Sequence, residues 1–317
     1  MNIKNILFPS RPQADTLLSI FLLRKFGEKM FPGVSTADIT FSAHMSADVD
    51  TNALLEQGTL ALDIGGGELD HHNKEKVTLS ELVARKLGMD RDPALEKIVE
   101  YVRRDDMYGK GTISKDPIDR AFGLSGLLTN LNKVHGTNHM KIVDILLPLI
   151  DAHHVEEYRR TTEMPKEVEE RLKNGKAESF MVKQRDKSLK VIIIESDNPS
   201  MSGYLRSQLG GAHDVVAQWS SSGHLNILTR PVKKVDLRSL AAVIRATEMQ
   251  EKGMDAPINE LAKTGKIESI PEWYFDPATN SIQNGGMAPK DVPATKVEKM
   301  ALKKLLELGL SEQLWKP

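Results

Sequence analysis

The chain begins with short apolar segments that alternate with a helical pattern, and each apolar segment stops abruptly at polar residues, proline or glycine. The three segments cover residues 5–8, 38–43 and 58–64. Between the first two, residues 15–26 place leucine and phenylalanine at the spacing of an amphipathic helix. Because strands that alternate with helices favour a parallel sheet with helices on its faces, we predict an α/β fold.

Polar residues follow each of these predicted strands. Arg11 and Asp15 follow the first strand, His44 follows the second, and the segment 63–72 follows the third. In parallel sheets, ligands collect at the carboxyl ends of the strands. We therefore expect these residues to meet at one edge of the sheet.

Helical patterns dominate the next part of the chain, and a second group of strands follows a charged stretch that contains a proline. The predicted helices cover residues 79–87, 93–103, 118–132 and 140–160, with a break at residues 105–109. The later elements are hairpins of residues 179–183 with 189–195 and 214–220 with 224–229, a helix at 237–250, short strands at 273–275 and 281–283, and a helix at 294–308. We predict a metal-binding domain on a parallel sheet at residues 1–160, a connector at 161–176 and a smaller mixed α/β domain at 177–317.

The composition excludes several classes of function. The 317 residues include no cysteine, which removes disulfides, thiolate nucleophiles and cysteine-ligated metal sites. The formal net charge of −1 gives no overall attraction to nucleic acid, so binding of a phosphate polymer requires a local basic patch or a bound metal ion. No apolar stretch is long enough to span a bilayer and the N-terminus has no signal-peptide pattern, so we expect a cytoplasmic protein without a membrane partner.

The segment 61–73 concentrates the side chains with the clearest chemistry. Asp63, Asp70, His71 and His72 place four potential metal ligands within ten residues, directly after a predicted strand. Carboxylate and imidazole groups bind manganese, iron, zinc or magnesium, and manganese is favoured where oxygen ligands dominate. The alternative is a polar turn with two surface histidines. We favour a metal site because the cluster follows a strand and a triple glycine allows the backbone to turn sharply.

This segment resembles two motifs of the DHH phosphoesterase superfamily. Asp63-Ile64-Gly65-Gly66 followed by Asp70-His71-His72 is similar to motifs II and III, and closest to the Myg-type branch (the melanocyte-proliferating-gene exonuclease family), whose pattern is Asp-Val-Gly-Gly and then Asp-His-His-Gln. The resemblance extends in the right order over residues 78–87, residues 105–109 in the place of the Asp-Asn-Gly motif IV, and residues 273–308.

The resemblance implies a DHH-like first domain and a role for each motif residue. Asp63 would bridge two divalent ions, His71 would bind one of them, and His72 would face the substrate phosphate. Asp106, or in second place Asp105, would complete the second ion site. The implied activity is a manganese-dependent or magnesium-dependent hydrolase, a nuclease that cleaves single-stranded RNA, DNA or short oligonucleotides with one or two ions.

The residues after the first predicted strand depart from the family pattern. Motif I of the family supplies histidines and aspartate, whereas this chain has Pro9-Ser10-Arg11-Pro12-Gln13-Ala14-Asp15, in which only Asp15 matches. Asp15 has two interpretations of equal weight, a metal ligand or the cap of the helix that follows it. Two substitutes are available for the missing ligands: His44 as an imidazole, or Arg11 as a fixed positive charge that binds phosphate.

This departure keeps two other hypotheses open. In the first, the chain is a catalytically degenerate DHH-like protein that binds phosphate or nucleic acid without turnover. In the second, the aspartate and histidine cluster holds one metal ion that only stabilises the fold.

The second predicted domain carries two further candidate features. Arg230 and Lys233 belong to a basic group at a strand-to-helix junction, and Gly285-Gly286 forms a glycine turn. In the resembled family these two places contact the substrate, so all four residues are candidate substrate-binding residues. The alternative for the basic group is a solvated surface.

Overall fold

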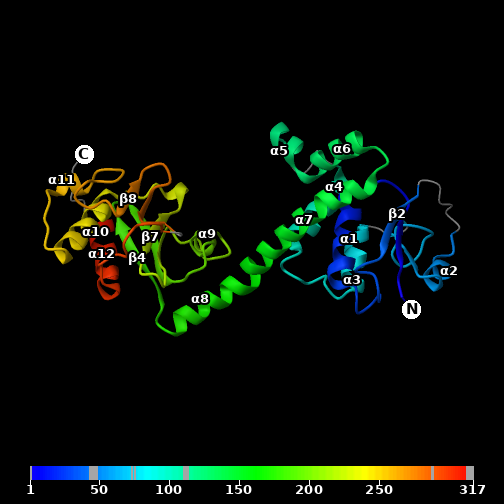
Figure 1. Cartoon of the computed structure of the whole chain (residues 1–317), viewed down its shortest axis with the longest axis horizontal. Coiled ribbons are helices and arrows are strands. Elements are labelled where there is room, and N and C mark those ends of the chain that lie inside the picture. The colour runs from blue at the N-terminus through cyan, green and yellow to red at the C-terminus, as the bar shows by residue number, and fades with distance from the viewer. Residues whose placement is uncertain are drawn as a thin grey trace. The chain divides into compact units, whose positions relative to one another are not determined.

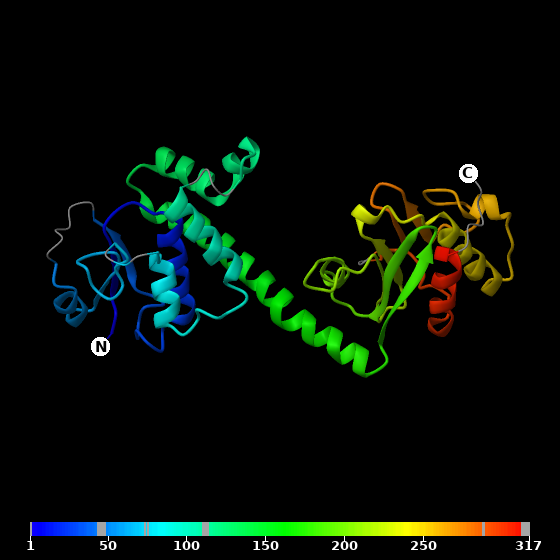
Figure 2. The same ribbon diagram turned by 180° about the vertical axis from the view of Figure 1, so that it is seen from behind.

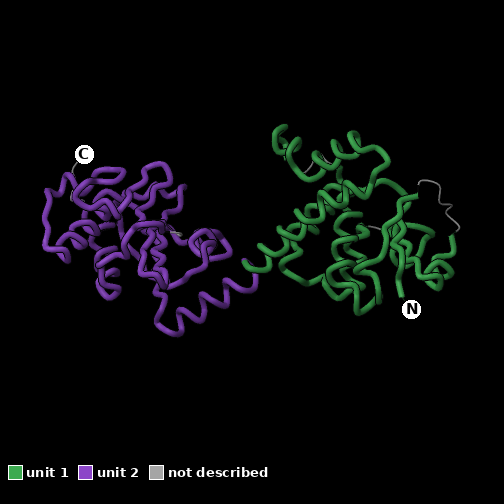
Figure 3. Tube along the Cα trace, in the orientation of Figure 1, with its two compact units in different colours: residues 1–159 green, residues 160–317 purple. Residues whose placement is uncertain are grey.

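The computed structural model describes residues 2–42, 49–72, 74, 76–109, 114–286 and 289–311. It divides into two compact units, residues 1–159 and residues 160–317 (Figure 3). The units are almost equal in length, so the smaller size predicted for the second domain is wrong. The candidate residue His44 lies outside the described residues.

The first unit is built on the predicted parallel sheet. Strands β1 (Asn5–Phe8), β2 (Asp38–Phe41) and β3 (Thr59–Ala61) are arranged in the order β2-β1-β3, and both pairings are parallel (Figure 1). The mixed α/β class is therefore confirmed. Because β1 lies between β2 and β3, the chain leaves β1 toward one neighbour and later returns to its other side. The carboxyl ends of β1 and β3 thus form a switch point, the position where open α/β sheets bind ligands.

Helices surround this sheet, and the helix α1 is at the centre. The helices are α1 (Ala14–Phe26), α2 (Thr51–Glu56), α3 (Leu79–Lys86), α4 (Glu96–Tyr108), α5 (Pro117–Phe122), α6 (Leu124–His135) and α7 (His139–Tyr158). Helix α1 packs against α3, α4 and α7 (Figure 1). It is buried on nearly all sides rather than along one stripe, because its Leu, Ile and Phe residues occupy most of its circumference.

Three predicted boundaries in this unit are wrong. Residues 105–109 do not break the helix, since α4 continues to Tyr108 and ends at Gly109, whose φ of 79° suits a residue without Cβ. The predicted helix at 118–132 is two helices, which separate at Gly123 because its backbone is extended. The third strand ends at Ala61, so Asp63 follows it instead of belonging to it.

The second unit contains a six-stranded mixed sheet. Its strands are β4 (Ala177–Gln184), β5 (Lys187–Glu195), β6 (Val215–Trp219), β7 (Leu225–Thr229), β8 (Trp273–Asp276) and β9 (Ser281–Asn284), in the order β4-β5-β6-β7-β9-β8. The two predicted hairpins, β4 with β5 and β6 with β7, are confirmed as antiparallel pairs. Strands β5 and β6 pair in parallel, and β8 with β9 closes the other edge.

Helices complete the second unit. Its helices are α8 (Met164–Lys173), α9 (Met201–Arg206), a 3-10 turn (Pro231–Lys233), α10 (Arg238–Glu251), α11 (Ile258–Leu261) and α12 (Lys299–Ser311). Helix α12 packs against α10 and β4 (Figure 2). The predicted connector is helical: a π-helical turn (Arg159–Glu163) leads into α8, which packs against β4 and β5. Across the described residues, no helix combines the length and apolarity needed to cross a bilayer.

Candidate metal centre

A small cavity lies at the switch point of the first sheet. It has a volume of about 100 Å³ and is lined by residues that follow β1 and β3, by Leu79 at the start of α3 and by Asp106 of α4. The polar lining residues are Ser10, Gln13, Asp15, Thr16, Asp63, His71, His72 and Asp106. Three of these carry carboxylates and none is a lysine or an arginine, so the cavity is acidic.

The loop after β3 brings Asp63 and the two histidines into this cavity. Asp63 has a left-handed φ of 62°, and Gly65 and Gly66 also have positive φ values. The backbone N–H of Asp63 donates to the carbonyl of Leu69, and the backbone N–H of Gly66 donates to Asp70 Oδ2 at 2.8 Å. These bonds close a tight loop in which Asp63 holds a left-handed backbone conformation that aspartate adopts more readily than most residues.

His71 lies between two carboxylates. Its Nδ1 is 2.7 Å from Asp63 Oδ1, and its Nε2 is 3.6 Å from Asp106 Oδ2. Both Nδ1 and Asp63 Oδ1 are buried, and neither has another hydrogen-bond partner. Contact with Asp63 raises the pKa of His71 to about 9, and Asp15 and Asp106 add to the effect while burial opposes it. The two atoms thus form a buried ion pair when His71 is protonated, and a metal ion that binds there has to displace that proton.

Asp15 lies in the cavity wall and also holds another helix. Its two carboxylate oxygens accept the backbone N–H groups of Leu79 and Ser80, each at 2.8 Å, in the first turn of α3. The cap residue of its own helix is Gln13, which makes no side-chain capping bond. Asp15 is 6% exposed, and this burial, with a contribution from the charge of Asp106, raises its pKa to about 6. Asp15 therefore supports α3 and does not cap α1, which was one of its two interpretations from the sequence.

Asp106 completes the group of carboxylates. It is carried by the last turns of α4, which was predicted to be broken at this place. Burial raises the pKa of Asp106, and the charges of Asp63 and Asp105 raise it further against the attraction of His71. Burial is the main cause of the raised pKa values of Asp15 and Asp106, and neighbouring carboxylates add to it.

His72 is held by Asp70. Its Nδ1 is 2.8 Å from Asp70 Oδ1, and its ring stacks on His71 with the centroids 4.8 Å apart. Asp70 also accepts the backbone N–H groups of His72 and Gly66. Burial would raise the pKa of Asp70, but these hydrogen bonds outweigh it and lower the pKa. Since the His72 side chain is 61% exposed, Asp70 orients an imidazole that is open to solvent.

Two sets of three side chains could hold a metal ion. They are Asp63, His71 and His72, and Asp15, His71 and Asp106, and in each set the ligand atoms lie within 4.8 Å of one another. Elsewhere in the described part of the chain, no set of three His, Asp or Glu side chains meets this spacing. The five residues named as ligands or catalytic groups from the sequence thus meet in one place.

Other candidate residues lie outside the cavity lining. Arg11 is exposed and does not line it. Asp105 follows Arg104 on α4 and has one buried carboxylate oxygen without a hydrogen-bond partner, but it is not a lining residue either. Sequence reasoning missed Ser10, Gln13 and Thr16, whose one available signal was their position directly after β1.

The candidate substrate residues of the second unit have partners within that unit. Asp214 lies 3.8 Å from Arg230 and 3.7 Å from Lys233. Gly285 and Gly286 both have positive φ values, which the turn after β9 requires, and the carbonyl of Gly286 accepts a hydrogen bond from the side chain of Asn226. The basic pair therefore balances a buried carboxylate.

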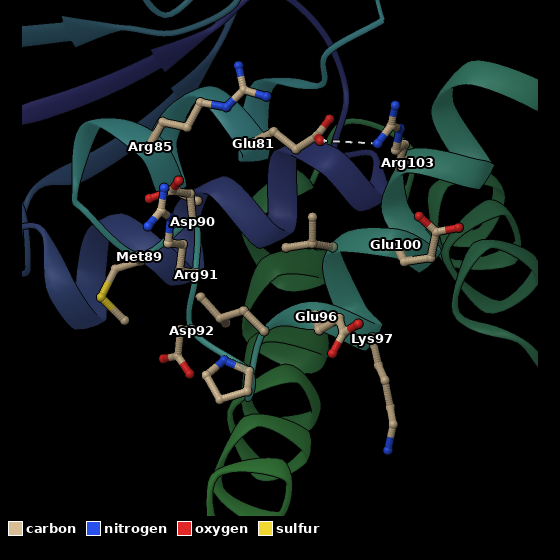
Figure 4. A pocket seen from close by; sticks show the side chains of 14 residues that line it. Glu81, Arg85, Met89, Asp90, Arg91, Asp92, Glu96, Lys97, Glu100 and Arg103 are labelled. Atoms are coloured by element: carbon tan, nitrogen blue, oxygen red, sulfur yellow. Dashed lines mark ion pairs between the residues drawn. The ribbon is translucent and has the colours of Figure 1, made fainter. Parts of the chain in front are cut away.

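A larger cavity of about 770 Å³ lies between α3 and α4 (Figure 4). Its floor is apolar, with Ala84 and Leu95 buried, and its rim mixes acidic and basic side chains. Glu81 and Arg103 point toward each other there at 3.8 Å. Because opposite charges alternate around this rim and none of the close ligand sets lies in it, the small acidic cavity is the better candidate for chemistry.

The side chains of this cavity and the distances between them indicate a metal centre. No protein-family model matches the sequence, and no curated protein matches it significantly.

Proposed function

We propose that this chain is a divalent-metal-dependent phosphoesterase whose reaction takes place in the acidic cavity at the switch point. The observation that carries the proposal is the convergence of Asp15, Asp63 and Asp106 on His71, with no lysine or arginine in the lining. A cavity of this charge attracts a cation, and carboxylate and imidazole ligands together suit manganese or magnesium.

The same charge argues against phosphate binding without a metal ion. A phosphate group in the cavity would meet three carboxylates, and two like charges about 4 Å apart repel by about 4 kcal/mol at an effective dielectric constant of 20. His71 alone does not offset this repulsion. A divalent ion is therefore required before a phosphoester can enter.

The side chains divide into ligands and supporting groups. His71 would hold the metal either with Asp63 or with Asp15 and Asp106, which belong to the two sets whose ligand atoms lie close together. When bound, a divalent ion makes water a nucleophile near neutral pH and neutralises charge on the phosphate. Asp70 keeps the proton of His72 on Nδ1, so Nε2 is the ring nitrogen that can exchange a proton with the substrate.

The proposed substrates are single-stranded RNA or DNA and short oligonucleotides. This choice follows from the resemblance of residues 63–72 to the DHH phosphoesterases and their Myg-type branch. The cavity itself supports the phosphoester chemistry.

The test is hydrolysis of short RNA and DNA oligonucleotides with manganese, in the wild type, Asp63→Ala and His71→Ala. Asp144→Ala is the matched control, because Asp144 is an exposed residue of α7. We expect turnover by the wild type and the control and its loss in both cavity variants. Oligonucleotide affinity without turnover would instead identify a binding protein, and a metal-dependent rise in thermal stability alone would identify a structural ion.

A further inference from the structure

We infer that Lys74 is a positioning residue, which holds the backbone of the metal-binding loop in the shape that an ion requires. The inference rests on the proposed metal function, because the loop of residues 63–72 carries Asp63, His71 and His72. Lys74 follows this loop and does not line the acidic cavity. Its role is therefore indirect and runs through the loop backbone.

The ammonium group of Lys74 donates to two successive carbonyls of the loop. Its Nζ is 3.2 Å from the carbonyl oxygen of Gly67 and 2.5 Å from that of Glu68. The backbone N–H of Lys74 also donates to the carbonyl of His71, at 2.9 Å. A charged donor makes stronger hydrogen bonds than a neutral one. Together these three bonds close a ring of residues 67–74 that contains His71.

The loop needs such ties because it is rich in glycine. Residues 65–67 are three successive glycines, and glycine loses more conformational freedom on folding than any other residue. One side of this run lies against the start of α2. A Cβ at position 65 would be 2.6 Å from the carbonyl oxygen of Val49, and one at position 67 would be 2.9 Å from Thr51 Oγ1. Packing thus limits the glycine run, and Lys74 fixes the carbonyls that come directly after it.

The ring leads directly to the metal ligands. The carbonyl of Leu69 accepts the backbone N–H of Asp63, and Asp63 Oδ1 lies 2.7 Å from His71 Nδ1. Rotation of the peptide units held by Lys74 would move Leu69 and, with it, both ligands. His71 belongs to both candidate ligand sets, so its position affects an ion in either set. Metal affinity should therefore depend on Lys74.

Lys86 provides a matched comparison, because it contacts the same loop residue in another way. Its Nζ is 2.8 Å from each carboxylate oxygen of Glu68, whose side chain is 70% exposed. An exposed ion pair of this kind contributes little to stability. Lys86 thus brings a positive charge to the loop without holding its backbone. Removal of a positive charge by itself should strengthen cation binding slightly in either variant.

The experiment measures manganese binding by the full-length wild type, Lys74→Met, Lys74→Arg and Lys86→Met, from the electron paramagnetic resonance signal of unbound manganese. The Kd of Lys74→Met should rise about tenfold, the low end of the effect of residues that orient metal ligands. Lys74→Arg should stay within about threefold of the wild type, since a guanidinium group can donate to the same carbonyls. Lys86→Met should bind manganese at least as tightly as the wild type.

The unfolding temperature of metal-free Lys74→Met should stay within about 2 °C of the wild-type value, because this side chain is exposed. A larger fall would assign Lys74 to the stability of the whole unit and overturn the inference. Equal affinity of Lys74→Met and the wild type, or an equal loss in Lys86→Met, would also overturn it. Absence of manganese binding by the wild type would refute the metal function together with the inference. The expected binding pattern without oligonucleotide hydrolysis would support the inference and refute only the proposed activity.

Discussion

Asp15 Oδ1 accepts the backbone N–H of Ser80 at 2.8 Å, although the two residues are 65 positions apart in the chain. This bond joins the first turn of α1 to the first turn of α3 beside the acidic cavity. The same carboxylate also accepts the N–H of Leu79, so it satisfies two of the backbone donors that a helix start leaves free.

Asp15→Asn should lower the stability of the first unit. An amide offers one acceptor oxygen in place of two, so one buried N–H of α3 loses its partner, which costs about 1–3 kcal/mol. Removal of the buried charge, whose pKa is raised to about 6, opposes this loss, so we expect a net change at the low end of that range. Urea unfolding followed by far-ultraviolet circular dichroism measures the change, with Asp144→Asn on the surface of α7 as the control. Equal stability of Asp15→Asn and the wild type would show that relief of the buried charge cancels the lost bond to α3.

Asp106→Asn should stabilise the metal-free protein near neutral pH. The pKa of Asp106 is raised, which means that its ionised form is disfavoured in the folded protein. Removing that charge should raise the unfolding temperature, and about 2–4 °C corresponds to 1 kcal/mol in a unit of this size. With manganese the wild type should have the higher unfolding temperature of the two, because bound manganese stabilises only the wild type. Differential scanning calorimetry with and without manganese tests both parts, and a variant that remains the more stable one in manganese would exclude Asp106 as a ligand.

The second unit should lose stability in mild acid through His213. Its Nδ1 lies 3.2 Å from the carbonyl of Leu205, and burial lowers its pKa below the ordinary value of 6.5. Below pH 6.5, His213 binds a proton in the unfolded chain but stays neutral in the folded chain. The free energy of unfolding is therefore highest above that pH and decreases as the pH falls toward the pKa of His213 in the folded protein. Tryptophan fluorescence is a suitable probe of unfolding, because all three tryptophans belong to the same unit as His213, residues 160–317. They are Trp219, Trp273 and Trp315.

His213→Asn keeps a side-chain N–H near the position of Nδ1 and removes the titration. We expect its stability to change less than that of the wild type between pH 7 and about 5. His135→Asn on α6 of the first unit is the control and should follow the wild-type curve. Parallel curves for wild type and His213→Asn would assign the acid sensitivity to other groups.

Arg245 should be essential to the second unit. It is fully buried and donates to the carbonyls of Leu261, Lys263, Gly265 and Trp273. Burial lowers its pKa to about 10, so it remains charged at neutral pH. Arg245→Met would leave these carbonyls without the donor, and we expect a loss of about 3–5 kcal/mol.

Urea unfolding of Arg245→Met by tryptophan fluorescence measures that loss. Arg185→Met, which replaces an arginine in the exposed β4–β5 turn, is the control and should change stability by less than about 1 kcal/mol. A similarly small change in Arg245→Met would mean that water or a rearranged loop satisfies the four carbonyls.

The sequence by itself determined the elements whose signal is local. Strand β1 was predicted with its observed bounds, and the hairpins of the second unit and the parallel first sheet follow from apolar runs, turn residues and strand–helix alternation. The cluster of Asp63, His71 and His72 was also visible, because these residues are close in the chain and a short loop keeps them close in space.

Only the tertiary structure decided which distant residues join that cluster and in what role. Asp106 reaches His71 because α4 continues past the predicted break. Gly109 is compatible both with a helix that stops before residue 105 and with one that ends at Tyr108, and the packing of α4 decides between them. Asp15 was equally compatible with a ligand and with a cap of its own helix, and its actual partner is α3. The physical reason is that periodicity and capping preferences describe neighbours within a few residues. The charge, burial and free ligand atoms of a site depend on segments that meet only when the chain has folded.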